Sequence, residues 1–200
     1  MKKLLLVLTV VCGFSMMSIA QKATIDKPKV EAKQLTKKGY DILPDALHPM
    51  KKQLEFVYAN QSTKESDGSP RYLMAVGIAS DASLTQAKAT AREKAVQDMT
   101  NQVMKKMKSI IEKNGGIQEK SSITVAELLS IVEEKCKQKM ISGPILADFY
   151  KKDKGKYVVK RYCTYSYKDA RTMAIDYFEA ELKNESEKLK SALRNPANWR

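Results

Sequence analysis

The most informative part of this chain reads YLMAVGIASDASLTQAKATAREKAVQDM, from residue 72 to residue 99. In residues 72–79, larger apolar side chains alternate with smaller ones, so both faces of an extended segment would be apolar or small. This pattern is typical of a strand that a helix covers on one face and that is partly shielded on the other. Gly77 has no side chain, so we expect another element to approach the strand closely at this position.

A long helix is predicted to follow this strand, from Ser83 to about Lys113. The Ser83 hydroxyl can accept a hydrogen bond from the Gln86 amide while the Gln86 side chain reaches back, which is the pattern of a capping box. An apolar residue recurs at every fourth position, with alanines first and larger side chains later, so the early half can lie close to a sheet. Asn-Gly-Gly at residues 114–116 is typical of a helix end. The stripe consists of Ala87, Ala91, Ala95, Met99, Val103, Met107 and Ile111.

A second helix and two strands are predicted next. Thr124, followed three residues later by Glu127, indicates a second capping box and the start of a shorter helix. Residues 145–150 and 157–167 are rich in β-branched and aromatic side chains and are predicted to be strands. The lysine-rich residues 151–156 join them, so the two strands form an antiparallel hairpin.

The last predicted helix spans residues 170–194. Its first half has an apolar face, but its second half carries only Leu189 and Leu193 among charged residues. We therefore expect the second half to project from the core. Residues 196–200 form a short tail in which Trp199 either tucks back or meets a partner.

The chain before residue 72 provides one more helix, predicted at residues 45–60, and a surface loop at residues 61–71. Residues 21–44 are rich in lysine, poor in large apolar side chains and interrupted by Pro28, so we expect a flexible leader.

This order of helices and strands predicts an α+β fold with one domain at residues 45–195. We expect a small, mainly antiparallel sheet of about three strands, packed on the long alanine-rich helix, with further N- and C-terminal helices.

Residues 1–20 are typical of a secretory signal peptide. Two lysines precede an apolar run at residues 4–11, which is shorter than the roughly 18 residues needed to cross a bilayer. Small residues up to Ala20 suit cleavage before Gln21. We therefore expect an exported protein of the bacterial periplasm or cell envelope.

The three cysteines leave two questions open. Cys12 offers a lipid-attachment site, but a bacterial lipoprotein signal has a small residue before that cysteine and Val11 fits the processing site poorly. We therefore expect no lipid anchor through Cys12. Cys136 and Cys163 could form a disulfide in an oxidising compartment or remain as two buried thiols, and their sequence positions do not decide between these alternatives.

The chain is basic, with 36 Lys and Arg against 23 Asp and Glu and a formal net charge of +13. The excess is spread along the sequence, with local clusters at residues 105–108 and 151–156. Such a surface attracts anionic lipid headgroups or acidic polysaccharide by a salt-screened interaction, although a merely well-solvated basic protein is the alternative. The sequence has no nucleic-acid-binding signature, so we expect no nucleic-acid partner and at most a peripheral membrane association.

The sequence contains no recognisable catalytic motif. His48 is the only histidine, so it cannot form a multi-histidine metal site, and no serine or cysteine stands out as its nucleophile. The Gly115-Gly116 pair follows a helix and does not join a strand to a helix, unlike a phosphate-binding loop. We therefore predict no enzyme, no cofactor and no metal. The clustered acids are interpreted as partners of nearby lysines on helix surfaces; they are Glu133, Glu134, Glu179, Glu181, Glu185 and Glu187.

Aromatic and basic residues alternate near the end of the second hairpin strand. Outward tyrosines beside cations could stack on sugar rings or on the side chains of a partner, although tyrosine is also a strong strand former that packs in sheets. We take this segment, with the single tryptophan, as the candidate partner surface. Its residues are Lys160, Arg161, Tyr162, Tyr165, Tyr167 and Trp199.

Three of these segments resemble the LPP-twenty lipoprotein family, whose fold is shared with the N-terminal domain of flagellar assembly protein T. The resemblance implies an envelope location and an α+β fold, and it brings no catalytic residues. It rests on Val76, Gly77, Ile78 and Ala79, on the helix positions Ala87, Ala89, Ala91, Ala95 and Met99, and on Tyr157, Val158 and Val159.

The functional expectation is an envelope protein without catalytic activity that acts as a binding or assembly module toward another envelope protein. The alternative is a module that binds the cell wall or an anionic glycan through its basic clusters.

Overall fold

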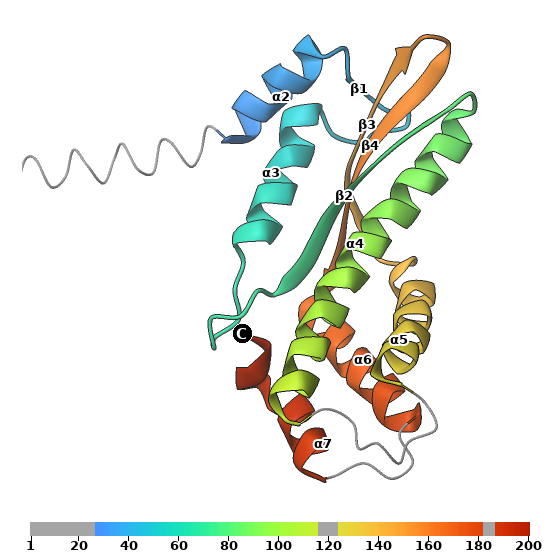
Figure 1. Ribbon diagram of the computed structural model, residues 1–200. Helices are drawn as coiled ribbons and strands as arrows, with labels where there is room; N and C mark the ends of the chain where they lie inside the picture. Colours follow the sequence, from blue (N-terminus) through green and yellow to red (C-terminus); the bar gives the residue numbers. More distant parts are fainter. Residues whose placement is uncertain (1–26, 116–123, 182–186) are drawn as a thin grey trace, which may run out of the picture.

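The computed structural model describes residues 27–115, 124–181 and 187–200 (Figure 1). The predicted signal peptide at residues 1–20 and Cys12 lie outside these residues. The described part contains six α-helices, one short 3₁₀ helix and one four-strand sheet. The elements are α2 (Lys27–Lys37), β1 (Asp41–Ile42), α3 (Met50–Ser62), β2 (Tyr72–Asp81), α4 (Leu84–Lys113), α5 (Val125–Met140), β3 (Ile145–Asp153), β4 (Lys156–Ser166), α6 (Tyr167–Glu181), α7 (Glu187–Arg194) and η1 (Pro196–Trp199).

The sheet is antiparallel throughout and its strand order is β1-β3-β4-β2. The α+β class is therefore confirmed, with one strand more than the three that we expected. The strands β2 and β4 pair along their whole length, with Gly77 opposite Arg161. In Figure 1 the helices α2 and α3 cover one face of the sheet and α4 covers the other, so the sheet is the middle of three layers.

The long helix α4 packs directly on β2 through its alanines, as predicted. Ala87, Ala91 and Ala95 are completely buried. A Cβ atom added to Gly77 would lie 1.6 Å from the backbone oxygen of Ala91, so only glycine allows the helix to lie at this distance. At the start of α4 the Ser83 hydroxyl accepts from the Gln86 amide, while the Ser83 N–H donates to the Asp81 carboxylate.

The predicted flexible leader at residues 21–44 is wrong for its described part, because residues 27–37 form α2 and residues 41–42 form β1, whereas residues 21–26 lie outside the described residues. Pro28 does not interrupt the helix, because it lies in the first turn, where proline is tolerated. Leu35 and Leu43 are buried, and Leu35 packs with α3 and the sheet. Two well-placed leucines therefore anchor a segment whose overall composition is polar.

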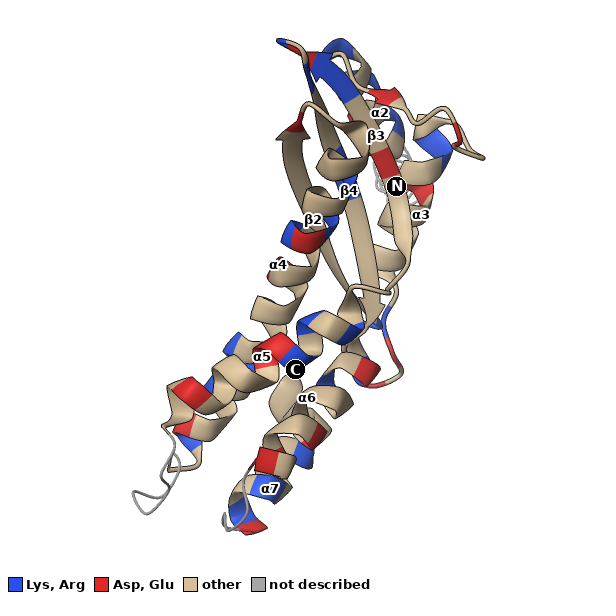
Figure 2. Ribbon diagram, turned by 90° about the vertical axis from the view of Figure 1, so that its right-hand side faces the viewer, with Lys and Arg blue, Asp and Glu red and all other residues tan. Residues whose placement is uncertain are grey.

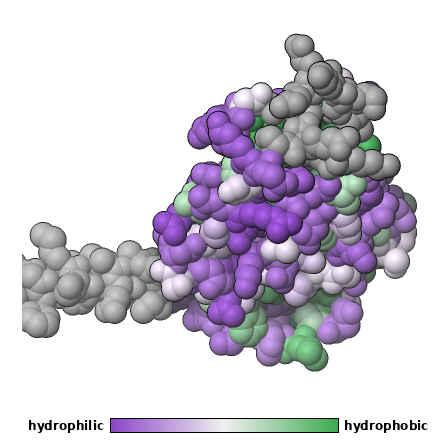
Figure 3. All heavy atoms as spheres, turned by 90° about the horizontal axis from the view of Figure 1, so that it is seen from below, coloured by the Kyte–Doolittle hydropathy of each residue, from purple (hydrophilic) through white to green (hydrophobic). Residues whose placement is uncertain are grey.

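The helices α5, α6 and α7 and the 3₁₀ helix η1 gather around the second half of α4 (Figure 1). The predicted Thr124–Glu127 capping box at the start of α5 is present, with both reciprocal hydrogen bonds. Met99, Met107 and Ile111 of α4 are fully buried in the largest apolar core that the described residues form. The face seen from below is mainly hydrophilic, with hydrophobic residues in small separate spots (Figure 3).

The expectation that the second half of the last helix projects is wrong, and of the two alternatives for Trp199 in residues 196–200 the structure shows the one in which it tucks back. Leu189 and Leu193 of α7 are buried in the same core as α4 and α6. Trp199 is 2% exposed, and its indole N–H donates to the Leu193 carbonyl at 2.6 Å. The Tyr167 hydroxyl in turn donates to the Trp199 carbonyl at 2.6 Å, so the tryptophan tucks back.

The hairpin turn is shorter than predicted. Residues 151–153 and 156 belong to the strands, and only Lys154 and Gly155 connect them. Both have positive φ angles, 48° and 77°, as a tight two-residue hairpin turn requires.

Cys136 and Cys163 are free thiols and both are buried. Of the two alternatives left open by the sequence, a disulfide or two buried thiols, the structure therefore has the two buried thiols.

Replacing Gly77 by alanine is expected to destabilise the fold by about 3 kcal/mol or more, because α4 must move away from β2 to admit the methyl group. Urea unfolding measures this change. Val76→Ala is the control, since Val76 points to the other face and is 37% exposed, and about 1 kcal/mol or less is expected. Equal unfolding free energies for the two variants would contradict the close helix–strand contact.

Trp199→Ala is expected to lower the free energy of unfolding by about 3–5 kcal/mol, because it empties a fully packed site and leaves the Leu193 carbonyl without its indole donor. The control is Leu47→Ala, at a side chain that is 92% exposed, which should change the free energy of unfolding by less than about 0.5 kcal/mol. Thermal and urea unfolding compare the stabilities of the two variants. A Trp199 variant as stable as the Leu47 variant would show that the C-terminal residues do not belong to the core.

Candidate functional site

The six residues of the predicted partner surface do not form one exposed surface. Successive side chains of β4 alternate between the two faces of the sheet, so Lys160 and Tyr162 face α2 while Arg161 lies under α4. Tyr167 and Trp199 are buried in the core around α6 and α7. Only Lys160 and Tyr165 keep a partly exposed side chain, so the pattern reflects packing in the sheet.

A polar cluster centred on Glu31 is the most site-like group of side chains on the α2 face. Glu31 of α2 accepts hydrogen bonds from Tyr162 of β4, from the Tyr58 hydroxyl of α3 at 2.8 Å and from the Lys160 ammonium of β4 at 3.0 Å. One carboxylate therefore connects α2 to α3 and to the sheet. The Glu31 cluster is defined as Glu31, Tyr58, Lys160 and Tyr162.

The electrostatics of the Glu31 cluster favour an ionised carboxylate and neutral phenols. Burial by itself raises the pKa of Glu31, but the hydrogen bonds from Tyr162, Tyr58 and Lys160 outweigh it, so the pKa lies below its ordinary 4.5. Burial and the neighbouring carboxylate raise the pKa of Tyr58 to about 12 and raise that of Tyr162 further. All members are therefore engaged with one another at neutral pH, which is how a structural cluster behaves.

Arg161 forms a second polar cluster on the opposite face. Its guanidinium pairs with the Asp148 carboxylate of β3 through two nitrogens and donates to the Lys88 carbonyl of α4 at 3.1 Å. The arginine is buried, so loss of either partner would leave an uncompensated charge inside the protein. This pair joins β3, β4 and α4 and presents no group to solvent for a substrate.

The other candidate residues are also engaged in local contacts. Most of the clustered acids pair with nearby lysines as predicted: Glu133 and Glu134 with Lys137, Glu181 with Lys135 and Glu187 with Lys190. Glu179 pairs with Arg194 instead, and Glu185 lies outside the described residues. His48 is exposed, and its ring lies edge-on to Phe56 with the centroids 5.4 Å apart.

The buried thiol of Cys136 is not a nucleophile at neutral pH. Burial, followed by the charge of Glu133, raises its pKa to about 12.

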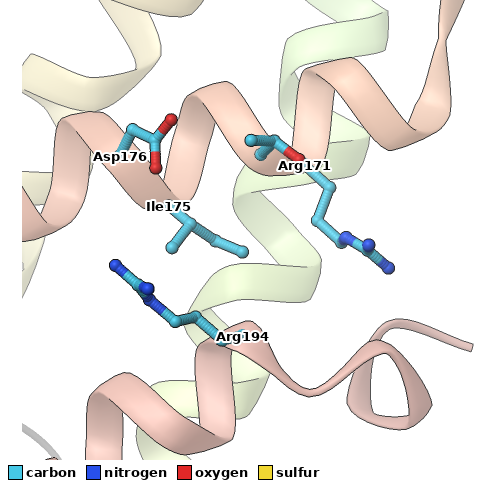
Figure 4. Close-up of a pocket in the computed structure, with 5 residues that line it drawn as sticks. Arg171, Ile175, Asp176 and Arg194 are labelled. Carbon is cyan, nitrogen blue, oxygen red and sulfur yellow. The ribbon is translucent and has the colours of Figure 1, made fainter.

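A small pocket of about 160 Å³ lies between α6 and α7 (Figure 4). Arg171, Ile175, Asp176 and Arg194 line it, and Arg171 points away from the other three. The Arg194 guanidinium binds the Glu179 carboxylate through two nitrogens, so this cation is already satisfied. The pocket offers little to a charged ligand.

The lysines of α2 were missed by sequence reasoning. Lys29, Lys33 and Lys37 line a shallow groove of about 370 Å³ between α2 and the start of α3, with Lys51 on the opposite wall. Lysines spaced four residues apart lie on one side of a helix, so the spacing could have indicated this row. It did not do so here, because the segment was expected to be a flexible leader and not a helix.

Further lysines lie at the hairpin tip, and Figure 2 shows them near α2 at one end of the molecule. Lys151 connects the two elements, because its ammonium lies 5.4 Å from the ring centroid of Tyr40, which follows α2. We call this region the basic end; it comprises Lys29, Lys33, Lys37, Lys38, Lys51, Lys52, Lys151, Lys152, Lys154 and Lys156.

The described residues contain neither a metal-ligand cluster nor a helix suited to a membrane span. In residues 27–115, 124–181 and 187–200, no three His, Cys, Asp or Glu side chains come together in a way that could hold a metal ion. Over the same part of the chain, no helix combines the length and the apolar character of a membrane span.

Glu31→Gln tests the charge of the Glu31 cluster. A folded pKa below 4.5 stabilises the fold fully above pH 4.5, and this contribution is lost as the pH falls through the lowered value. The variant should therefore be less stable than wild type by about 1–2 kcal/mol at pH 7, and this gap should narrow as the pH falls below 4.5 and through the lowered pKa of Glu31. Urea unfolding over a series of pH values from 7 downward measures the gap, and Glu65→Gln, in a surface ion pair, is the control. A gap independent of pH would contradict this role of the carboxylate.

The comparisons of this chain with protein-family models, with curated proteins and with solved structures found no match. The resemblance to the LPP-twenty family therefore stays a prediction from the sequence.

Proposed function

We propose that this protein is an exported binding module of the cell envelope, without catalytic activity, and that it holds an anionic envelope component through its basic end. The export part of the proposal rests on the signal-like residues 1–20. The binding part rests on the exposed lysines of α2, α3 and the hairpin tip.

The main support for the proposal is a contrast between two sets of polar groups in the described part of the chain: the buried ones all have hydrogen-bond partners, whereas many lysines at the basic end have no carboxylate partner. In the described residues, every buried side-chain nitrogen and oxygen has a hydrogen-bond partner, so the polar clusters have no buried group left to bind a substrate. At the basic end, in contrast, the described lysines outnumber the carboxylates close to them, and Glu31 is turned toward the sheet. Such a surface attracts polyanions without a shaped catalytic pocket.

Assembly with another protein is the second candidate function, and one observation favours it. Val76 and Ile78 of the edge strand β2 are 37% and 48% exposed, on the face that α4 does not cover. However, Gln102 and Lys94 of α4 donate to the carbonyls of Met74 and Ile78, at 3.3 Å and 3.1 Å, so the edge already has hydrogen-bond partners. We therefore place anion binding first.

The proposed function is tested by sedimenting the processed chain, residues 21–200, with purified cell walls and by measuring its binding to immobilised acidic and neutral polysaccharides. We expect binding to cell walls and to the acidic polymer at about 50 mM salt and its loss at about 500 mM, since the attraction is screened. Binding to neither material, or equal binding to the neutral polymer, would show that the basic end has no such role.

A further inference from the structure

The groove between α2 and α3 has a row of cations on one side. Lys29, Lys33 and Lys37 follow one another at four-residue intervals, so they lie on one side of α2 with about 6 Å between neighbours along the helix axis. The row is thus about 12 Å long. A single small anion would reach only part of it, whereas an extended anion could contact all three ammonium groups.

The floor of the groove is apolar. Ala32 and Thr36 of α2 lie between the lysines, and the Thr36 hydroxyl is turned back to the Ala32 carbonyl of its own helix at 3.0 Å. Lys51 closes the opposite wall. The groove therefore combines a base of C–H groups with a rim of ammonium groups, which suits a polymer that has both apolar ring faces and negative charges.

The acidic residues nearby do not neutralise this row. Among the described residues, no carboxylate lies within 4.0 Å of the ammonium groups of Lys29, Lys33 or Lys37. Glu31 pairs with Lys160 on the sheet side, and Glu55 pairs with Lys51 and Lys52. Like charges four residues apart on a helix repel one another, so a bound anion would relieve this repulsion.

We propose that the α2–α3 groove binds a linear acidic polysaccharide, with its anionic groups along the row of Lys29, Lys33 and Lys37 and its sugar rings over Ala32 and Thr36. The inference rests on the proposed function and names its site and ligand class. A bilayer is a poorer fit, because a helix that lies in a membrane surface needs an apolar outer face. The exposed residues of α2 include only one apolar side chain, Val30.

The site is tested by the triple variant Lys29→Gln, Lys33→Gln and Lys37→Gln, because glutamine keeps the helix propensity of lysine and removes its charge. The matched control is the triple variant Lys105→Gln, Lys108→Gln and Lys113→Gln, which removes three exposed charges from the far half of α4. Binding of fluorescent polygalacturonate, a linear acidic polysaccharide, is titrated at low salt. Vesicles of anionic and zwitterionic lipid form a second arm.

We expect the dissociation constant for polygalacturonate to rise about tenfold or more in the α2 variant and less than about threefold in the control. Replacing the same three lysines of α2 by arginine should keep the affinity within about threefold, which separates loss of charge from loss of fold.

Equal weakening by the two glutamine triples would overturn the groove as the site while leaving the proposed function in place. No binding of polygalacturonate or of cell walls by the wild type would overturn both. Binding to anionic vesicles without binding to polygalacturonate would replace the polysaccharide by a membrane surface.

Discussion

The contact between Gly77 and the backbone of Ala91 is the constraint on which the rest of the arrangement depends. It fixes where α4 crosses β2, and a Cβ atom at this point would come within 1.6 Å of the helix backbone. Because α4 has 30 residues, its second half extends beyond this contact and becomes the axis around which α5, α6, α7 and η1 pack. The composition of α4 follows this division: alanines lie against the sheet, and methionines and isoleucines lie among the helices.

Both faces of the sheet are covered by apolar packing, but α2 contributes little to it. On one face α4 packs closely, and on the other α3 buries Leu54 and Val57 against the sheet. The helix α2 buries only Pro28 and Leu35 and is also held by the carboxylate of Glu31, so its attachment depends in part on the ionisation of that group. The outer side of the same helix is free to carry lysines, because its contribution to the core is small.

The sequence was most informative where local spacing and burial agree. The strand at residues 72–81, the alanine stripe of α4 and the Thr124 cap were predictable from their spacing, and so was the need for glycine at position 77. Two features were not predictable from the sequence: the alignment of lysines on α2, and the packing of Leu189, Leu193 and Trp199. Each depends on a few apolar residues that contact a surface distant in the sequence. The tyrosine pattern of β4 was misleading for a related reason: it does not show which face of the sheet is covered.

Both edges of the sheet are protected against pairing with another chain. The edge strand β1 has only two residues, and the backbone N–H of Asp148, on the neighbouring β3, donates to the Gln53 side chain at 3.0 Å. On the opposite edge, side chains of α4 engage two carbonyls of β2, and one of them brings the positive charge of Lys94. Exposed strand edges are templates for fibril growth, and short strands and lysines are common defences against it. The fold should therefore resist cross-β aggregation even where apolar side chains of β2 remain in contact with solvent.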